Sequence, residues 1–137
     1  MSQPGHATSP RPSTYLAFDV SLRRVGVAVG NSLLRQATPL ATITVAGDAR
    51  FAAIAAQVTA WQPDALVVGV PVHPDGAPHD NTRRAQRFAR QLHGRFRLPV
   101  HEVDERYTTT EARAAGAADL DAVAAGLILE QFLRTLP

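Results

Sequence analysis

Carboxylates at the ends of apolar segments are the residues of this sequence with the clearest chemical potential. An acid at the end of a buried strand is costly unless a positive charge, usually a metal ion, offsets it. Acids that a fold brings together also repel one another, so a cluster of them persists where divalent cations neutralise it. Five carboxylates have this placement: Asp19, Asp104, Glu105, Asp119 and Asp121.

Hydrolysis of a phosphodiester bond is the chemistry that such a cluster supports. Two Mg²⁺ or Mn²⁺ ions, about 4 Å apart and held by shared carboxylates, activate a water molecule and stabilise the leaving oxygen. These hard cations prefer oxygen ligands, so neither histidine nor cysteine is needed. A plainer interpretation stays open for each acid alone. Asp19 would cap a turn, and Asp119 or Asp121 would cap a helix. The pair Asp104 and Glu105 would then be a solvated strand end.

The elements that must position these acids lie far apart in the sequence. Two apolar runs at 15–18 and 25–29, joined by a short polar turn, predict a buried β-hairpin. The later patterns predict, in order, a strand at 39–45, a helix at 49–61, a strand at 65–70, a helix from 81 or 82 to 92 ended by Gly94, a strand at 98–103, a short helix at 108–115 and a helix from 119–121 to 133. This order resembles the ribonuclease H-like fold. The expected fold class is α/β, with a mixed five-stranded sheet (three antiparallel strands, then two parallel) and helices on both faces.

Length and composition are consistent with one globular domain, expected at 14–137 of the 137 residues. Residues 1–13 are rich in proline, serine and glycine without an apolar period, and we expect a disordered tail there. The absence of cysteine excludes disulfides and thiolate zinc sites. The apolar runs are far shorter than the roughly 20 residues that span a bilayer, and no secretion signal opens the chain. The expected compartment is the cytoplasm.

Arginine supplies all 14 basic side chains of the sequence. Guanidinium groups bind phosphates through paired hydrogen bonds, so a phosphate-bearing partner is expected. The arginines that flank the acids are predicted to hold phosphates of the scissile strand, with pairing to neighbouring carboxylates as the alternative. They are Arg23, Arg24 and Arg106.

A second group of arginines lies in the predicted helix from 81 or 82 to 92. Arg83, Arg87 and Arg90 are spaced by four and three residues, which places them on one helix face. No acid is four residues away from any of them, so the face is an unneutralised positive stripe. The stripe either extends contact with nucleic acid or is ordinary solvated surface.

Four blocks of the sequence resemble those of the YqgF family, also called RuvX, of ribonuclease H-like Holliday junction resolvases and pre-16S rRNA nucleases. The blocks are Asp19–Ala28, Val67–Pro71 with the Asp-Gly pair at 75–76, Asp104–Thr109 and Asp121–Leu129. In order and spacing they cover nearly all of residues 15–135. Two positions depart from the family pattern: Ser21 stands where glycine is usual, and Gly30-Asn31 replaces the common Ser-Asp.

The resemblance implies a metal-dependent nuclease. Its acids would fall at Asp19, at the pair of Asp104 and Glu105, and at Asp121. We predict that Asp19, Glu105 and Asp121 bind Mg²⁺ or Mn²⁺, with Asp104 as the alternative ligand on the last strand. The implied partner is structured nucleic acid (branched DNA, an RNA–DNA hybrid or pre-rRNA), bound by a monomer or homodimer. A non-catalytic nucleic-acid-binding or ribosome-assembly factor is the alternative function.

Overall fold

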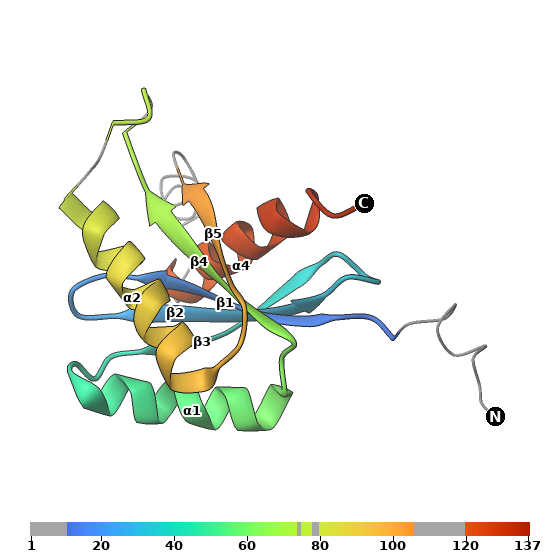
Figure 1. Ribbon diagram of the computed structural model, residues 1–137, viewed down its shortest axis with the longest axis horizontal. Coiled ribbons are helices and arrows are strands. Elements are labelled where there is room, and N and C mark those ends of the chain that lie inside the picture. Colours follow the sequence, from blue (N-terminus) through green and yellow to red (C-terminus); the bar gives the residue numbers. More distant parts are fainter. Residues whose placement is uncertain (1–10, 74, 78–79, 106–119) are drawn as a thin grey trace.

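The computed structural model describes residues 11–73, 75–77, 80–105 and 120–137. A five-stranded sheet with strand order β3-β2-β1-β4-β5 forms the centre (Figure 1). The elements are β1 Thr14–Val20, β2 Val25–Asn31, β3 Ala37–Ile43, α1 Asp48–Trp61, β4 Ala65–Pro71, α2 Asp80–Phe96, β5 Val100–Glu105 and α4 Leu120–Leu133.

Strand β1 is the middle of the sheet. It pairs antiparallel with β2, which pairs antiparallel with β3, and it pairs parallel with β4, which pairs parallel with β5. Both neighbours of β1 are apolar, as expected for strands buried on two faces. The expected mixed sheet of three antiparallel and two parallel strands is confirmed.

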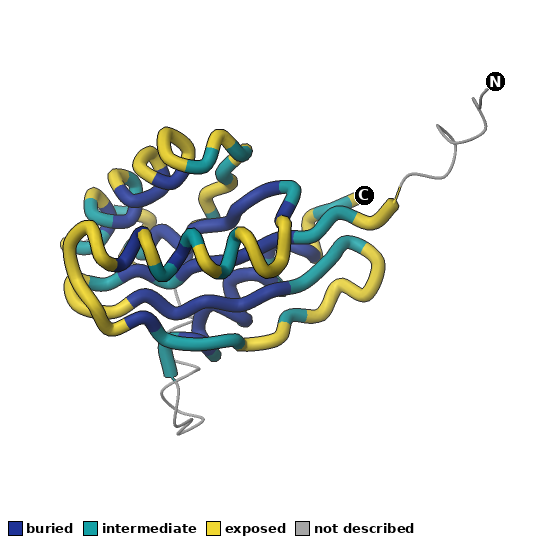
Figure 2. Tube along the Cα trace, turned by 90° about the horizontal axis from the view of Figure 1, so that it is seen from below, coloured by how far each residue is buried: buried dark blue, intermediate teal, exposed yellow. Residues whose placement is uncertain are grey.

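Helices cover both faces of the sheet (Figure 1). On one face, Phe18 of β1 packs with Phe51 of α1 and Phe88 of α2 in one buried cluster. On the other face, Tyr15 of β1 packs against Phe132 of α4, with ring centroids 5.1 Å apart. Burial follows the strands, while the outer sides of the helices are exposed (Figure 2). Alternate residues of β1 therefore point into different cores, which fixes the face of every side chain on the strand.

Several element boundaries differ from those expected, and β1 continues past Asp19 to Val20. Strand β3 begins and ends two residues earlier, and α2 continues through Gly94 to Phe96. The helix ends without glycine, because the residue after Phe96, Arg97, itself adopts a left-handed backbone with φ 57°. Strand β5 begins and ends two residues later than expected. Glu105 is therefore the last residue of the strand and does not follow it.

The first described residues contact the body of the fold. Arg11 forms an ion pair of 2.6 Å with Asp64, and the backbone N–H of Ser13 donates to Ser32. The remainder of the expected tail and the expected helix at 108–115 lie outside the described residues. In the part of the chain that the structure describes, no helix is both long and apolar enough to cross a membrane.

Candidate active site

Asp19 lies near the end of the central strand, on the sheet face that α4 covers. It shares this face with Tyr15 and Ala17, since side chains alternate along a strand. Its antiparallel partner on β2 is Gly26. On the other side, the register pairs Phe18 with Val68, so the next residue along β4, Gly69, is level with Asp19. Glycine on both sides of this half-buried carboxylate lets atoms of α4 and β5 approach the sheet closely.

Gly26 allows the first turn of α4 to approach the sheet. A Cβ atom added to Gly26 would lie 1.8 Å from the carbonyl oxygen of Asp121. No side chain fits there, so the close approach of helix and strand requires glycine at this position. Because Asp19 is the cross-strand partner of Gly26, the approach places Asp121 beside Asp19.

Glu105 reaches the same region from β5. Its carboxylate oxygen Oε2 would be 3.0 Å from a Cβ atom added to Gly69, so the carboxylate lies over that glycine. Glu105 is buried, with an exposed fraction of 4%. The three acids Asp19, Glu105 and Asp121 thus occupy one face of the sheet, around the two glycines.

Asp104 belongs to the opposite face. The ring of His101 contacts Phe132 of α4, which puts odd-numbered residues of β5 on the α4 side. Asp104 is exposed and shares its side of the strand with Val100 and Glu102, which line a surface hollow beside α2. The alternation of the strand therefore separates the two neighbouring acids, and Glu105 is the one on the same sheet face as Asp19.

Arg24 forms an ion pair with one of the three acids, Asp121. Its Nε atom lies 3.0 Å from Oδ2 of Asp121, and its side chain stays 60% exposed. Pairing with a neighbouring carboxylate, the alternative considered from the sequence, is thus what the structure shows for Arg24. Arg106 and Asp119 lie outside the described residues. Within the described ranges, no three acidic or histidine side chains are close enough to form a complete metal-binding set by themselves.

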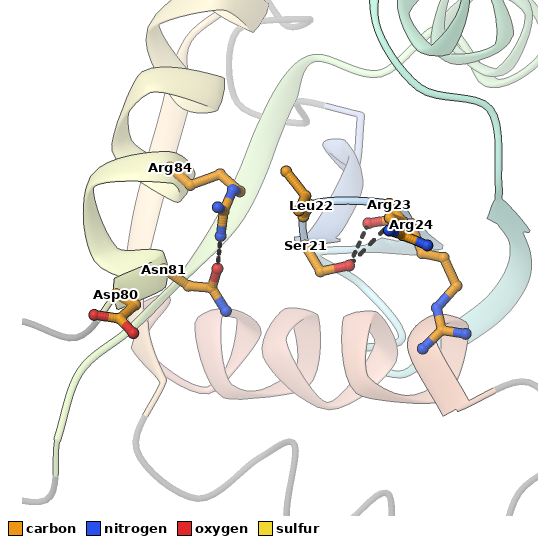
Figure 3. A pocket seen from close by; sticks show the side chains of 7 residues that line it. All are labelled: Ser21, Leu22, Arg23, Arg24, Asp80, Asn81 and Arg84. Atoms are coloured by element: carbon orange, nitrogen blue, oxygen red, sulfur yellow. Dashed lines mark hydrogen bonds between the residues drawn. The ribbon is translucent and has the colours of Figure 1, made fainter.

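A cleft of about 600 Å³ lies between the turn that joins β1 to β2 and the first turns of α2 (Figure 3). We call it the basic cleft. It is lined by Ser21, Leu22, Arg23 and Arg24 of the turn and by Asp80, Asn81 and Arg84 of α2. The guanidinium of Arg84 donates to the side-chain oxygen of Asn81. Figure 3 shows these two side chains facing the turn, with Asp80 on the outer side of the helix.

Arg50 of α1 supports the turn from inside the protein. Its Nη2 atom donates to the backbone oxygens of Ser21 and Leu22, at 3.4 and 3.1 Å. Sequence reasoning missed Arg50 and gave Arg84 no role. A signal for Arg50 was present, because it lies four residues before the buried Ile54 and therefore shares its helix face.

The predicted stripe of Arg83, Arg87 and Arg90 is exposed along α2. None of the three forms an ion pair with another described residue. Arg87 borders a cavity of about 200 Å³ that is also lined by Arg50 and Arg84. The stripe is therefore a positive surface, as the spacing predicts, and its contact with nucleic acid stays a prediction.

Several bacterial proteins are similar in sequence to this chain over most of its length. A protein of Polaromonas sp. is 67% identical over 124 residues, which cover 90% of each chain. A protein of Albidiferax ferrireducens is 68% identical over 90% of this chain and 79% of its own. One of Burkholderia pseudomallei is 52% identical over 96% of this chain and 94% of its own. All three are named "Putative pre-16S rRNA nuclease".

Solved structures share the fold at low sequence identity. RuvC of Thermus thermophilus in complex with a Holliday junction substrate has a TM-score of 0.52 and 13% identity, over 89% of this chain and 94% of that one. The Fowlpox virus resolvase in complex with Holliday junction DNA has a TM-score of 0.53 and 8% identity, over 89% and 97%. These similarities show the ribonuclease H-like fold that the order of elements predicts.

The family model described as "RuvX: Holliday junction resolvase" matches residues 13–135. The match spans β1, which carries Asp19, the turn with Arg24, and the first turn of α4 with Asp121. It also agrees with the resemblance carried by the four sequence blocks. With relatives up to 68% identical over most of the chain, the protein belongs to the RuvX family.

Proposed function

We propose that this protein is a metal-dependent nuclease that hydrolyses phosphodiester bonds of the precursor of 16S ribosomal RNA in the cytoplasm. The observation that supports the proposal is that Asp19, Glu105 and Asp121 lie on the α4 side of the sheet, around Gly26 and Gly69. The names of the relatives support the choice of substrate. Their identity to this chain, above 50%, makes a shared substrate class the simplest expectation.

The donor set is compatible with Mg²⁺ or Mn²⁺. All three candidate ligands offer carboxylate oxygens, which hard divalent cations prefer. Mg²⁺ is commonly held by one or two carboxylates together with waters and substrate phosphates, so a complete protein cage is not required. The acids would hold the cations as follows: Asp19 centrally, with Glu105 on one side and Asp121 on the other. When bound, a pair of such ions activates the attacking water and stabilises the leaving oxygen.

The residues of the chain have separate tasks in this proposal. Burial of Glu105 keeps its carboxylate in one position over Gly69, which orients it without the entropy cost of a mobile side chain. Arg24 neutralises Asp121 in the structure. Because its side chain is 60% exposed, it can turn from the carboxylate to a substrate phosphate.

Cleavage of a labelled fragment spanning a 16S rRNA precursor end tests the proposal. Wild-type protein with Mn²⁺ should cleave, and Asp19→Asn should lose at least about 10³-fold in rate, which corresponds to several kcal/mol of transition-state stabilisation. Glu105→Gln should lose activity to a similar degree. Asp104→Asn provides the matched comparison, because it removes the same charge from the opposite face and should retain most of the rate.

Two results would overturn the assignment. Near-native cleavage by Asp19→Asn would remove the central ligand from the mechanism. A large loss in Asp104→Asn with a small loss in Glu105→Gln would show that the wrong acid of β5 was chosen. A parallel reaction with four-way DNA junctions distinguishes rRNA processing from junction resolution. Binding without metal-dependent cleavage of any substrate would favour the non-catalytic alternative.

A further inference from the structure

The turn 21–24 separates two regions of opposite charge. On the α4 side, Arg24 is paired with Asp121 at the acids. On the α2 side, the same turn forms one wall of the basic cleft, and the first turn of α2 forms the other (Figure 3). A strand that is bound at the acids and continues past this turn would enter the basic cleft.

The basic cleft carries positive charge that the described residues do not neutralise. Arg23 and Arg84 line it, and neither forms an ion pair within the part of the chain that the structure describes. Asp80 is the one acid of the described lining, and its carboxylate points away from the turn (Figure 3). Guanidinium groups from two elements that face one gap are a suitable arrangement for a phosphate, which accepts several hydrogen bonds at once.

Arg50 strengthens this field from behind the turn. It is buried to an exposed fraction of 9%, and its Nε atom has no hydrogen-bond partner among the described residues. Burial, followed by the nearby charge of Arg84, lowers the pKa of Arg50. A buried cation that is bonded, among the described residues, to the carbonyl oxygens of Ser21 and Leu22 is costly, and a bound anion nearby would offset part of that cost.

Leu22 adds an apolar contact to the same cleft. Its side chain is 63% exposed and lines the cleft. Figure 3 shows it in the gap between the turn and Arg84. An apolar side chain beside a phosphate site suits an unpaired nucleotide, whose base or sugar can lie against it, whereas duplex bases stay stacked on one another.

We propose that the basic cleft binds a single-stranded segment of the substrate RNA, with a backbone phosphate on Arg84 and Arg23 and the adjoining nucleotide against Leu22. The proposal rests on the proposed nuclease function for the identity of the ligand. It adds a recognition site on the α2 side of the turn, outside the acids. The cleft would select precursor ends that carry an unpaired strand next to the cleavage point.

The salt dependence of RNA binding tests the charged contacts. The assay uses Asp19→Asn protein, so that the RNA stays intact, and a fluorescent single-stranded RNA whose anisotropy is followed over a range of NaCl concentrations. Each lost phosphate contact should reduce the slope of log K against log salt by about 0.7. Arg84→Gln and Arg23→Gln should each show this change. Leu22→Ala should weaken binding several-fold with an unchanged slope, since it removes no charge.

Arg134→Gln is the matched control. Arg134 is an exposed arginine beyond the last residue of α4, at the opposite end of that helix from Asp121, and should keep the wild-type slope. Melting temperatures identify any variant that fails to fold. If Arg84→Gln does not fold, Arg23→Gln still tests the cleft, because Arg23 lies in an exposed turn. Unchanged slopes for both cleft arginines, or an equal change in Arg134→Gln, would overturn the proposal.

The outcomes separate this proposal from the nuclease function. If the wild-type protein cleaves precursor RNA while the cleft variants bind like wild type, the nuclease function stands and the cleft proposal is wrong. If no cleavage is found but the cleft variants lose slope, the cleft binds RNA and the catalytic function is wrong. Equal affinity of the wild type for single-stranded and fully paired RNA would also refute selection of an unpaired strand.

Discussion

Replacement of Gly26 by alanine should damage both the stability and the activity of the protein through one displacement. The added Cβ atom would lie 1.8 Å from the carbonyl oxygen of Asp121 and 2.7 Å from the backbone nitrogen of Ala122. Both are backbone atoms, so no rotation of a side chain relieves the overlap. Non-bonded atoms of this kind settle at roughly 3.5 Å, so α4 must retreat by more than about 1 Å.

The magnitude follows from what that retreat disturbs. Helix α4 covers the sheet with eight buried residues, among them Ile128 and Leu129, and overpacking of such an interface costs about 1–3 kcal/mol. We expect the upper end of that range, because the obstacle is backbone. For a chain of this length, the corresponding loss in melting temperature is roughly 8–12 °C. A 1 Å misplacement of a catalytic group can cost about 10²-fold in rate, and Asp121 moves with the helix.

Calorimetry and the precursor cleavage assay measure the two effects on the same samples. Gly94→Ala is the control, because no described atom lies within 4 Å of its added Cβ, and alanine in a helix should stabilise by about 0.5–1 kcal/mol. Gly126→Ala is a second control on α4 itself, where the Cβ would make ordinary contacts of 3.6 Å or more. A Gly26→Ala protein with native melting temperature and rate would refute the close approach of helix and strand.

Three further predictions concern Asp64, Arg35 and Gly69. The backbone N–H of Thr14 and a nearby arginine lower the pKa of Asp64. The contribution of this carboxylate to stability is therefore present above about pH 4 and is lost as the pH falls through the lowered pKa. The difference in melting temperature between Asp64→Asn and wild type should shrink on acidification. Arg35 donates to three carbonyl oxygens near the end of the chain, so Arg35→Gln should lower the melting temperature by a few degrees and increase amide exchange after α4; unchanged exchange would contradict this. Gly69→Ala should reduce both the melting temperature and the cleavage rate, because its Cβ would overlap Cδ1 of the fully buried Ile128 and would lie 3.0 Å from Oε2 of Glu105.

The layout of the sheet could be predicted from the sequence because it depends on strong local patterns. The apolar runs of β1, β2 and β4 have no competing helical period, and their order leaves few topologies. The sequence favoured Glu105 but left Asp104 as an alternative, since the distinction depends on the register of β5 and the alternation of its side chains. An end point misplaced by two residues leaves both acids outside the strand, where alternation gives no information.

The basic cleft could not be predicted from the sequence either, for a different reason. Periodicity assigned Arg83, Arg87 and Arg90 to an exposed face of α2, and they are exposed. Arg84, about 100° around the helix, points toward a turn that is 60 residues earlier in the chain. Helical spacing describes which residues share a face, but it does not identify what that face meets.

If the proposed function holds, the turn 21–24 links metal binding and RNA binding thermodynamically. Arg24 holds Asp121 at 3.0 Å, and it belongs to the same four-residue segment as Arg23 and Leu22 of the basic cleft. In the proposed mechanism, a cation at Asp121 competes with Arg24 and releases it for a phosphate, while RNA that engages Arg24 exposes Asp121 to the cation. Each ligand then increases the affinity of the protein for the other by the same factor, because such coupling is reciprocal. In that mechanism, neither affinity would be a constant of the protein alone, and a metal titration without RNA would underestimate the metal affinity of the RNA complex.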